Sequence, residues 1–525
     1  MCRFRWLLAS ALLCCGFGVL ASEGFDDIVK LVKRGMKEEL ILSYVETSPV
    51  AYNLSAEEII SLRDLHVSDG VVTAIIKRGM SVRGKTSKPA SELPAVTQNP
   101  GTPPKELPAP PTPPAPTPPQ PSVAEPEIVG ETDVWAEDTE PAGGPMPPYQ
   151  FRYRNALYGT LAGYFQTQNK DIKVANDNSI ELNVPGFKKP MPVHVVPRHE
   201  RAPLVVVLLG IDGRADSSFG RLWPSWLANA GCHVLWFDST FAPSFISISG
   251  RGVTGNLRAE SAAVADIIAA FLERNDFKEK VSGIGVVGMS YGGIEALVLG
   301  ELAAAGKLPF KIDAIQSYCP PINLGSSGAL IDRWYAEDRW NFTLVELARK
   351  FSGHKPAHSD KDIPFDDEMM RAAIALAFRM GLADVIIRND QRFKLKLLPQ
   401  GNQFDEQYVQ RDFAETWGFQ RFLTELAFPY WNKKGEYENV GDMLTRMSVP
   451  YLFARQPACT ELIMADDDPL NVPDDLAALK ALPEAKRILF LPNGGHLGFV
   501  ANRWTKAKLL RFVEQIEKKE AKARP

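Results

Sequence analysis

Residues 281–302 read VSGIGVVGMSYGGIEALVLGEL. An apolar run, a glycine-flanked serine and a helix-forming segment follow one another directly, which predicts a strand, a tight turn and a helix. The turn, Gly288-Met289-Ser290-Tyr291-Gly292, has the Gly-x-Ser-x-Gly pattern of a nucleophile elbow. Glycines are needed on both sides because a side chain there would collide with the neighbouring strand or helix. Ser290 is therefore the candidate nucleophile, held at the end of a sheet.

A nucleophilic serine needs a base, and in this design the histidine comes last in the chain. Three histidines follow Ser290. His354 and His358 lie in a polar stretch with no strand-like run before it, whereas His496 lies in a glycine-rich loop. That loop follows the apolar run Ile488–Leu491, and the end of a strand is where a general base belongs. His496 is the candidate base; the alternative is a turn residue that caps the last helix.

The candidate acid comes from three consecutive aspartates, Asp466, Asp467 and Asp468, which follow the apolar residues 461–464. A carboxylate here would hold the imidazole in its working tautomer and stabilise the imidazolium. Only one of the three can do so. Asp468, directly before a proline, is the first candidate and Asp467 the alternative acid; the others form a solvated acidic loop or a helix cap.

Together these motifs resemble the α/β-hydrolase superfamily, and within it the YheT-like and embryogenesis-associated esterase branch. That branch has a Gly-Gly-His-x-Gly-Phe histidine loop and an Asp-Asp-Pro acid loop, which residues 494–499 and 467–469 match. Residues 418–430 are also similar in placement to the family's region before the acid strand. The resemblance covers residues 150–515. It implies an α/β-hydrolase fold.

The branch also has a His-Gly-x-Glu-Gly turn after an early strand. Here the matching residues 209–213 read Leu-Gly-Ile-Asp-Gly, so Leu209 replaces the histidine while Asp212 keeps the acidic position. Two backbone N–H groups should face the developing oxyanion, and they would come from Tyr291 and Ile211. The replacement at Leu209 removes no backbone donor, although it bears on the turn that aims Ile211. The alternative is an ordinary glycine turn.

Composition limits the classes of function. The chain has 525 residues, 45% of them hydrophobic and 10% aromatic, enough for a sizeable core. Its net charge is −4 and its isoelectric point about 6.1, and no basic face stands out, which argues against nucleic acid as a main partner. The sequence has no Walker-type phosphate loop and no Cys/His cluster with metal-ligand spacing. We expect no metal or organic cofactor.

The first 21 residues have the pattern of a signal peptide. Arg3 and Arg5 precede an apolar core, Trp6–Leu20, and small residues permit cleavage after Ala21. The expected protein is exported, periplasmic or secreted, with no membrane span after cleavage; an uncleaved anchor is the alternative. Three cysteines remain, Cys232, Cys319 and Cys459, and an odd number leaves at least one free thiol. Cys232 and Cys319 fall in or beside apolar runs, so we expect small buried hydrophobes rather than a disulfide framework.

Two regions precede the hydrolase-like part. Residues 24–82 contain a repeat in which Ile28 corresponds to Ile59 and Leu40 to Val71, with helical apolar spacing. It predicts a small helical domain of two repeated hairpins, which binds an unknown partner or serves as a spacer. Residues 83–148 are Pro-rich and predict a disordered linker with polyproline II segments. A ligand for a proline-reading module is the alternative to a tether.

Residues 149–520 alternate between strand-like and helical patterns. The helical patterns include Ala259–Leu272 and Ile294–Ala305. The strand-like runs are Leu204–Leu209, His233–Phe237, Gly283–Val287, Ala314–Tyr318, Tyr451–Ala454 and Ile488–Leu491. The alternation predicts an α/β fold, a mainly parallel sheet flanked by helices. The three candidate catalytic residues then fall at carboxyl ends of strands, where functional groups belong.

Residues about 325–445 interrupt this alternation and are mostly helical in pattern. They predict a cap-like insertion over the active site, the alternative being helices outside the sheet. Four tryptophans are candidates to line the pocket, although burial in the core is the default expectation for any single one: Trp334, Trp340, Trp417 and Trp431.

These features favour an exported serine hydrolase that cleaves a small-molecule or lipid-like carboxylic ester through an acyl-enzyme. Ser290 would attack, His496 would carry the proton and Asp468 would orient His496. A serine peptidase or amidase with the same triad is one alternative. A catalytically inactive hydrolase-fold binding or scaffold protein is another.

Overall fold

The computed structural model describes residues 146–337 except 169, residue 357, and residues 359–400 and 406–523. In the N-terminal part it describes 28, 38–47, 62, 67–68, 70–75 and 77–78. The chain divides into two compact units, residues 20–133 and a larger unit that holds residues 134–525. Each is described by itself.

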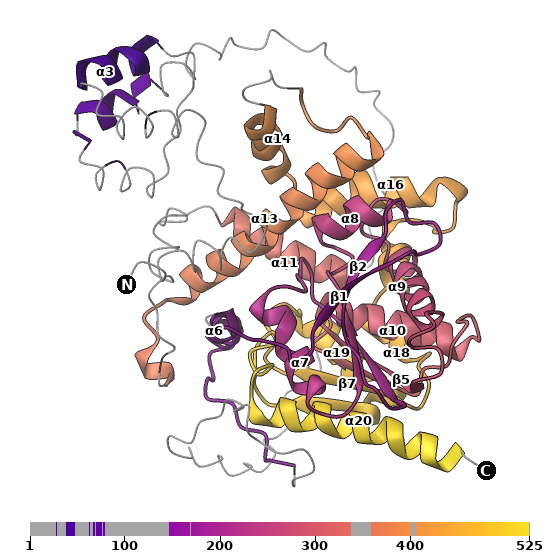
Figure 1. The fold of residues 1–525 in the computed structure, drawn as a ribbon. Coiled ribbons are helices and arrows are strands. Elements are labelled where there is room, and N and C mark those ends of the chain that lie inside the picture. Colours follow the sequence, from indigo (N-terminus) through magenta and orange to yellow (C-terminus); the bar gives the residue numbers. More distant parts are fainter. Residues whose placement is uncertain are drawn as a thin grey trace, which may run out of the picture. The chain divides into compact units, whose positions relative to one another are not determined.

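The larger unit contains an eight-stranded sheet in the order β1-β2-β4-β3-β5-β6-β7-β8 (Figure 1). The pairs β1–β2 and β2–β4 are antiparallel, and all other neighbours are parallel. The strands are β1 Asn178–Leu182, β2 Met191–Val196, β3 Ala202–Leu208, β4 His233–Trp236, β5 Val281–Met289, β6 Ala314–Tyr318, β7 Thr460–Ala465 and β8 Ile488–Leu491. Every residue of β3, β4 and β6 is buried, as expected for strands covered on both faces.

Helices cover both faces of this sheet (Figure 1). On one face α7 (Ser218–Ala228) and α20 (Arg503–Ala523) pack in a common core with β3, β4 and β5. On the other, α9 (Leu257–Leu272) and α10 (Tyr291–Ala304) share a second core. The fold class expected from the sequence is confirmed: the unit is an α/β-hydrolase fold, with most of the sheet parallel.

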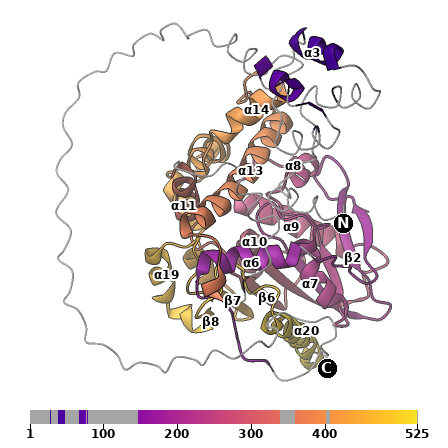
Figure 2. The ribbon, with the colours of Figure 1, turned by 90° about the vertical axis from the view of Figure 1, so that its left-hand side faces the viewer.

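Helices also fill the described part of the segment between β6 and β7. They are α11 Leu324–Ala336, η1 Asp360–Asp362, α13 Asp367–Phe393, α14 Glu406–Glu415, α15 Phe419–Arg421, the π-helical turn η2 Phe422–Ala427, α16 Phe428–Trp431, η3 Asn432–Lys434 and α17 Val440–Arg446. Figure 2 shows the long helix α13 beside α11 and α14, and α13 contacts both of these helices. The helical content expected for this segment is therefore present.

Two expectations about strands were wrong or incomplete. Residues Tyr451–Ala454 do not form a strand but lie at the end of a short helix, α18 (Val449–Phe453). Pro450 occupies the first turn of that helix, where proline is favoured, so a short apolar run was assigned to the wrong class. Strands β1 and β2 were not expected at all. β1 is an edge strand with mostly exposed residues and carries little apolar signal.

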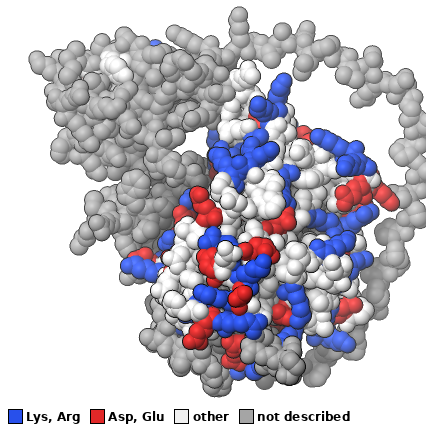
Figure 3. Space-filling model, turned by 45° about the vertical axis from the view of Figure 1, so that its right-hand side comes forward, with Lys and Arg blue, Asp and Glu red and all other residues white. Residues whose placement is uncertain are grey.

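Three further helices complete the larger unit. They are α6 Ala156–Gln168, which precedes the sheet, α8 Pro243–Ser249, which follows β4, and α19 Pro473–Lys480, which follows β7; a 3₁₀ turn, η4 Pro483–Arg487, leads into β8. Lysine, arginine and acidic side chains are interspersed on the face shown in Figure 3. None of the helices in the described residues is both long enough and apolar enough to cross a bilayer.

The N-terminal unit shows one helix in full, α3 (Glu38–Thr47). Its described buried residues come from both predicted copies of the repeat: Ile28, Ile41, Val45, Leu62, Val71, Val72 and Ile75. The Ser68 hydroxyl donates a hydrogen bond to Glu38 and so links the copies. The predicted signal peptide and Pro-rich linker lie outside the described residues, apart from the last residues before 149.

Candidate active site

Ser290 lies on a sharp turn between β5 and α10 with φ 52° and ψ −118°. A non-glycine residue at positive φ is strained, and such strain is typical of a nucleophile elbow. A Cβ at Gly288 would lie 2.1 Å from the carbonyl oxygen of Gly292, and a Cβ at Gly292 2.5 Å from that of Leu208. The Ser290 N–H donates to the carbonyl of Tyr318 at 2.9 Å. The two glycines and this bond fix the turn against both neighbouring strands.

His496 contacts both of its expected partners. Its Nε2 lies 2.9 Å from the Ser290 Oγ, and its Nδ1 lies 2.8 Å from Oδ2 of Asp468. Their side chains are buried, with 5% of Ser290, 5% of Asp468 and 7% of His496 exposed. The other carboxylate oxygen of Asp468 accepts the N–H of Leu470 at 2.9 Å. A carboxylate at Nδ1 favours a proton there, which leaves Nε2 free to accept the serine proton.

Asp467, the alternative acid, supports the histidine loop instead. Its Oδ1 accepts the N–H of Gly495 at 2.9 Å, one residue before His496. Burial raises its pKa, while the N–H groups of Gly495 and Gly494 lower it. The two neighbouring aspartates thus have different partners: Asp468 contacts the imidazole and Asp467 contacts the loop that carries it.

The histidine loop also rests on α6, which the sequence did not connect with the site. The Oγ1 of Thr160 accepts the N–H of His496 at 2.8 Å and donates to the carbonyl of Ala156 at 2.8 Å. A Cβ at Gly163 would lie 2.6 Å from the Cα of Gly498, so α6 and the loop are in close backbone contact. Nothing at residues 156–163 marks such a role in the sequence, because the partner lies more than 300 residues later.

The two expected oxyanion donors flank the serine. Tyr291 is the first residue of α10, where the N–H has no acceptor within the helix. On the other side, a Cβ at Gly210 would lie 3.3 Å from the Cβ of Ser290, so the turn that carries Ile211 closely approaches the nucleophile. That turn is closed by a bond from the Gly213 N–H to the Gly210 carbonyl at 2.9 Å.

A cavity of about 230 Å³ opens above Ser290 and His496. Its walls come from four elements: α6, the turn after β3, the start of α7 and α13. Leu161, Tyr164, Phe165, Leu209, Ile211, Phe219, Ala373, Ile374, Ala377, Phe378, Leu382 and Leu497 supply its apolar surface. Asp212, Arg214 and Ser217 supply polar groups from the segment between β3 and α7. The cavity is therefore mainly apolar, with the serine and histidine among its few polar groups.

None of the three candidate tryptophans that can be checked lines the cavity. Trp334 and Trp417 are buried in the core, and the indole N–H of Trp431 donates to the carbonyl of Val253 at 2.7 Å. Trp340 lies outside the described residues, as do His354 and His358. The insertion contributes small and aliphatic residues of α13 and one aromatic side chain, Phe378, instead.

The described residues hold no group of three or more His, Cys, Asp or Glu side chains arranged to bind a metal ion. Cys232 and Cys319 are buried, Cys459 is half-buried, and all three are free thiols.

No protein-family model and no curated protein matches the chain. Among solved structures, an esterase of Pyrococcus furiosus is 13% identical over 66% of this chain and 92% of that one, with a TM-score of 0.36. An esterase of Pyrobaculum calidifontis is 15% identical over 69% and 91%, with a TM-score of 0.36. Acylaminoacyl peptidase of Pyrococcus horikoshii is 12% identical over 68% and 43%, with a TM-score of 0.34.

These solved structures are hydrolases of the α/β-hydrolase superfamily. Likeness at this level carries no information on substrate, and the YheT-like branch stays a prediction.

Proposed function

We propose that the chain is a serine hydrolase that cleaves carboxylic esters. One observation carries the proposal: the chain of contacts from Ser290 Oγ to His496 at 2.9 Å and on to Asp468 at 2.8 Å, at the floor of an apolar cavity. Nucleophile, base and orienting acid in this order are what acyl transfer requires.

In the proposed mechanism the Ser290 oxygen attacks the ester carbonyl while His496 Nε2 takes the hydroxyl proton. Asp468 stabilises the imidazolium, and the backbone N–H groups of Tyr291 and Ile211 receive the oxyanion. His496 then gives the proton to the leaving alcohol, and an acyl-enzyme remains. Water, activated by the same imidazole, releases the acid and restores the serine.

The cavity walls favour an ester over a peptide. A bound peptide needs partners for its main-chain N–H and C=O groups, since burying them without hydrogen bonds is costly. The walls formed by α6 and α13 are almost wholly apolar and offer few such partners. An apolar acyl group fits these walls without that cost. We propose α13 as the part of a cap that closes over it.

Export, with the mature protein periplasmic or secreted, belongs to the same proposal and rests on the signal-peptide pattern of residues 1–21. The role of the N-terminal helical unit as a partner-binding module or spacer is likewise proposed from its sequence pattern.

The first test is labelling of the full chain with a fluorophosphonate, beside the variants Ser290→Ala and His496→Ala. We expect wild type to label and both variants to lose labelling, with ester hydrolysis reduced roughly 10⁶-fold in Ser290→Ala. Ser327→Ala is a matched control, because this serine is equally buried and its hydroxyl has no hydrogen-bond partner. Folded wild type that does not label would remove the proposal and favour an inactive scaffold.

A second measurement separates ester from amide cleavage. Nitrophenyl butyrate and butyryl nitroanilide present the same acyl group with different leaving groups. We expect turnover of the ester and little of the anilide; comparable rates on both would favour the amidase or peptidase alternative.

A further inference from the structure

A buried polar cluster lies beside the serine turn, and the triad does not use it. Its members are Glu260 on α9, Tyr291 and Glu295 on α10, and Thr240 in the loop after β4, each at most 8% exposed. Glutamate side chains are almost never fully buried unless they are paired, because removing a carboxyl group from water is costly. Tyr291 connects the cluster to the reaction, since it directly follows the proposed nucleophile.

Hydrogen bonds organise the cluster around Glu260. The hydroxyl of Tyr291 donates to Oε2 of Glu260, and the N–H of Gly255 donates to Oε1 at 2.6 Å. Glu295, one helical turn after Tyr291, accepts the hydroxyl of Thr240 at 2.6 Å. Glu260 therefore receives a donor on each carboxylate oxygen.

Burial and these hydrogen bonds shift the pKa of the two glutamates. Burial raises the pKa of both carboxyls, that of Glu295 to about 8, so Glu295 keeps its proton at neutral pH. Two charged carboxylates side by side in a dry site would repel each other strongly. At Glu260 burial is the larger influence, while the hydrogen bonds from Tyr291 and Gly255 act in the opposite direction and lower the pKa.

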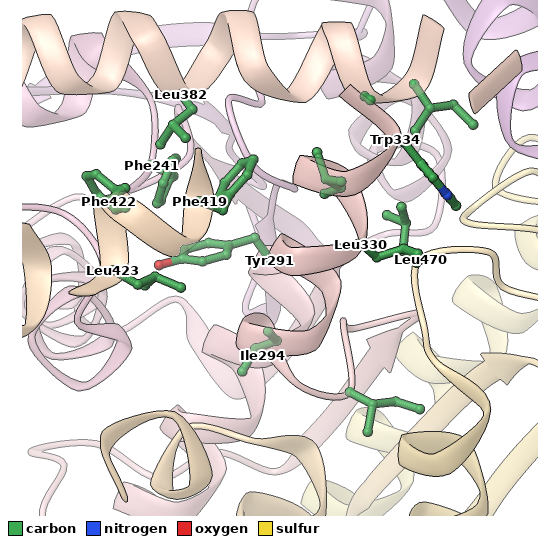
Figure 4. Packing of buried hydrophobic residues seen from close by; sticks show 14 of the residues in the cluster. Phe241, Tyr291, Ile294, Leu330, Trp334, Leu382, Phe419, Phe422, Leu423 and Leu470 are labelled. Carbon is green, nitrogen blue, oxygen red and sulfur yellow. The ribbon is translucent and has the colours of Figure 1, made fainter. Parts of the chain in front are cut away.

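The ring of Tyr291 is held along its length as well as at its tip. Phe241 packs against it edge to face with ring centroids 5.2 Å apart. Figure 4 shows the hydroxyl of Tyr291 directed away from α10, with Phe241, Phe422 and Leu423 around the ring. Because the Tyr291 side chain is held along its ring and at its hydroxyl, it limits how far its own backbone can rotate. That backbone carries one of the two proposed oxyanion donors.

We propose that Glu260 is a positioning residue for the oxyanion site: by holding the Tyr291 hydroxyl it fixes the direction of the Tyr291 N–H toward the reacting carbonyl. The proposal rests on the serine-hydrolase function proposed above. Glu260 touches no substrate. Its effect is on the transition state, because the oxyanion exists only there, and therefore on kcat rather than on KM.

The size of the effect follows from what a donor contributes. Removing one oxyanion-hole donor lowers kcat about 10²–10³-fold. Loosening a donor that stays in place costs part of this, and we expect about a tenfold loss.

The test compares Tyr291→Phe, Glu260→Gln and the double variant, with kcat and KM measured on one nitrophenyl ester. Both changes keep the shape of the side chain: Tyr291→Phe removes the donor, and Glu260→Gln leaves one acceptor oxygen for the two donors, the Tyr291 hydroxyl and the Gly255 N–H. Sites are counted by complete fluorophosphonate titration, so that kcat refers to correctly folded protein. Tyr153→Phe is the matched control, because its buried hydroxyl also makes one bond, to the Ala357 carbonyl at 2.7 Å, away from the cavity.

We expect kcat per titrated site to fall about tenfold in each single variant, KM to stay within twofold, and the double variant to be no slower than the slower single one. Tyr153→Phe should keep its kcat. Unchanged kcat per site in Tyr291→Phe, a change confined to KM, or losses that multiply in the double variant would each overturn the proposal. If Glu260→Gln does not fold, Tyr291→Phe decides alone. Wild type that never labels would instead remove the proposed function itself.

Discussion

The serine and the histidine of the candidate site are held in place by different means. Ser290 is fixed by a contiguous piece of chain, residues 281–302, whose turn is locked between strands by glycines and by a backbone bond. His496 lies on a loop held from outside, by the hydroxyl of Thr160 on one side and the carboxylate of Asp467 on the other. The candidate nucleophile is thus placed by backbone packing, and the candidate base by side-chain hydrogen bonds.

This difference predicts where damage is tolerated. Packing of backbone against backbone cannot adjust, so changes at the serine turn should disrupt the fold. A hydrogen bond to a loop can be lost while the loop stays near its place, so changes around His496 should mainly affect the reaction. The three predictions below test this contrast, from the largest expected effect to the smallest.

Gly292→Ala should have the largest effect. Its Cβ would lie 2.5 Å from the carbonyl oxygens of Leu208 and Leu209, both backbone atoms, so β3 and α10 must separate. We expect a loss of about 3 kcal/mol or more in the free energy of unfolding, measured by urea denaturation, together with loss of labelling. Gly306→Ala is the control: it has open space and φ 64°, and should cost about 1 kcal/mol. Equal losses at the two glycines would contradict rigid packing at the serine.

The pH dependence of stability should reveal the buried Glu295 beneath the serine turn. Its pKa rises from an ordinary value of 4.5 to about 8 because of burial. Between these values the unfolded chain releases the proton and the folded chain keeps it, so stability is full below about pH 4.5 and falls as pH rises toward 8. The slope for one such group is at most about 1.4 kcal/mol per pH unit.

Glu295→Gln replaces the titrating carboxyl group with a neutral amide. We expect urea unfolding of the variant to depend less on pH between 5 and 8 than that of wild type, measured in identical buffers and salt. If the stability of the variant depends on pH in the same way as that of wild type, Glu295 has an ordinary pKa. The site of Glu295 would then be better solvated than its burial indicates.

Thr160→Val should have the smallest effect on stability and act mainly on the rate. Valine keeps the shape but removes the oxygen that accepts the His496 N–H, at a cost of about 1 kcal/mol. We expect kcat on a nitrophenyl ester to fall about tenfold, because a misplaced imidazole transfers protons poorly. Thr160→Ser keeps the oxygen and should restore the rate. If both variants are equally slow, the hydroxyl is not what holds the loop.

The same contrast explains what could be foreseen from the sequence. The serine turn is local, so its glycines, its strand and its helix can all be recognised within residues 281–302. The order of Ser290, Asp468 and His496 could be expected from the design of such hydrolases, and the structure brings these three together. Which aspartate contacts the imidazole depends on the geometry of one turn after β7, and spacing alone left Asp467 and Asp468 open.

Other parts could not be foreseen, for physical reasons that differ. Thr160 acts through a contact with a residue far along the chain, and a lone helical threonine carries no signal of such a contact. Tyr451 lies in an apolar run too short to distinguish strand from helix. Composition could not tell which aromatic residues line the cavity: Trp334 and Trp417 lie in the core, whereas Tyr164, Phe165, Phe219 and Phe378 line the walls.

The contact between Thr160 and His496 can form only late in the synthesis of the chain. The two residues stand 336 positions apart, with every strand of the sheet between them. During synthesis Ser290 and α6 leave the ribosome before His496. Thr160 on α6 therefore cannot accept the His496 N–H until the loop after β8 has been made. A nascent chain that ends before residue 496 contains Ser290 but lacks the histidine that contacts it in the complete structure. Under the proposed function, a chain that ends before His496 lacks the base and should hydrolyse no ester.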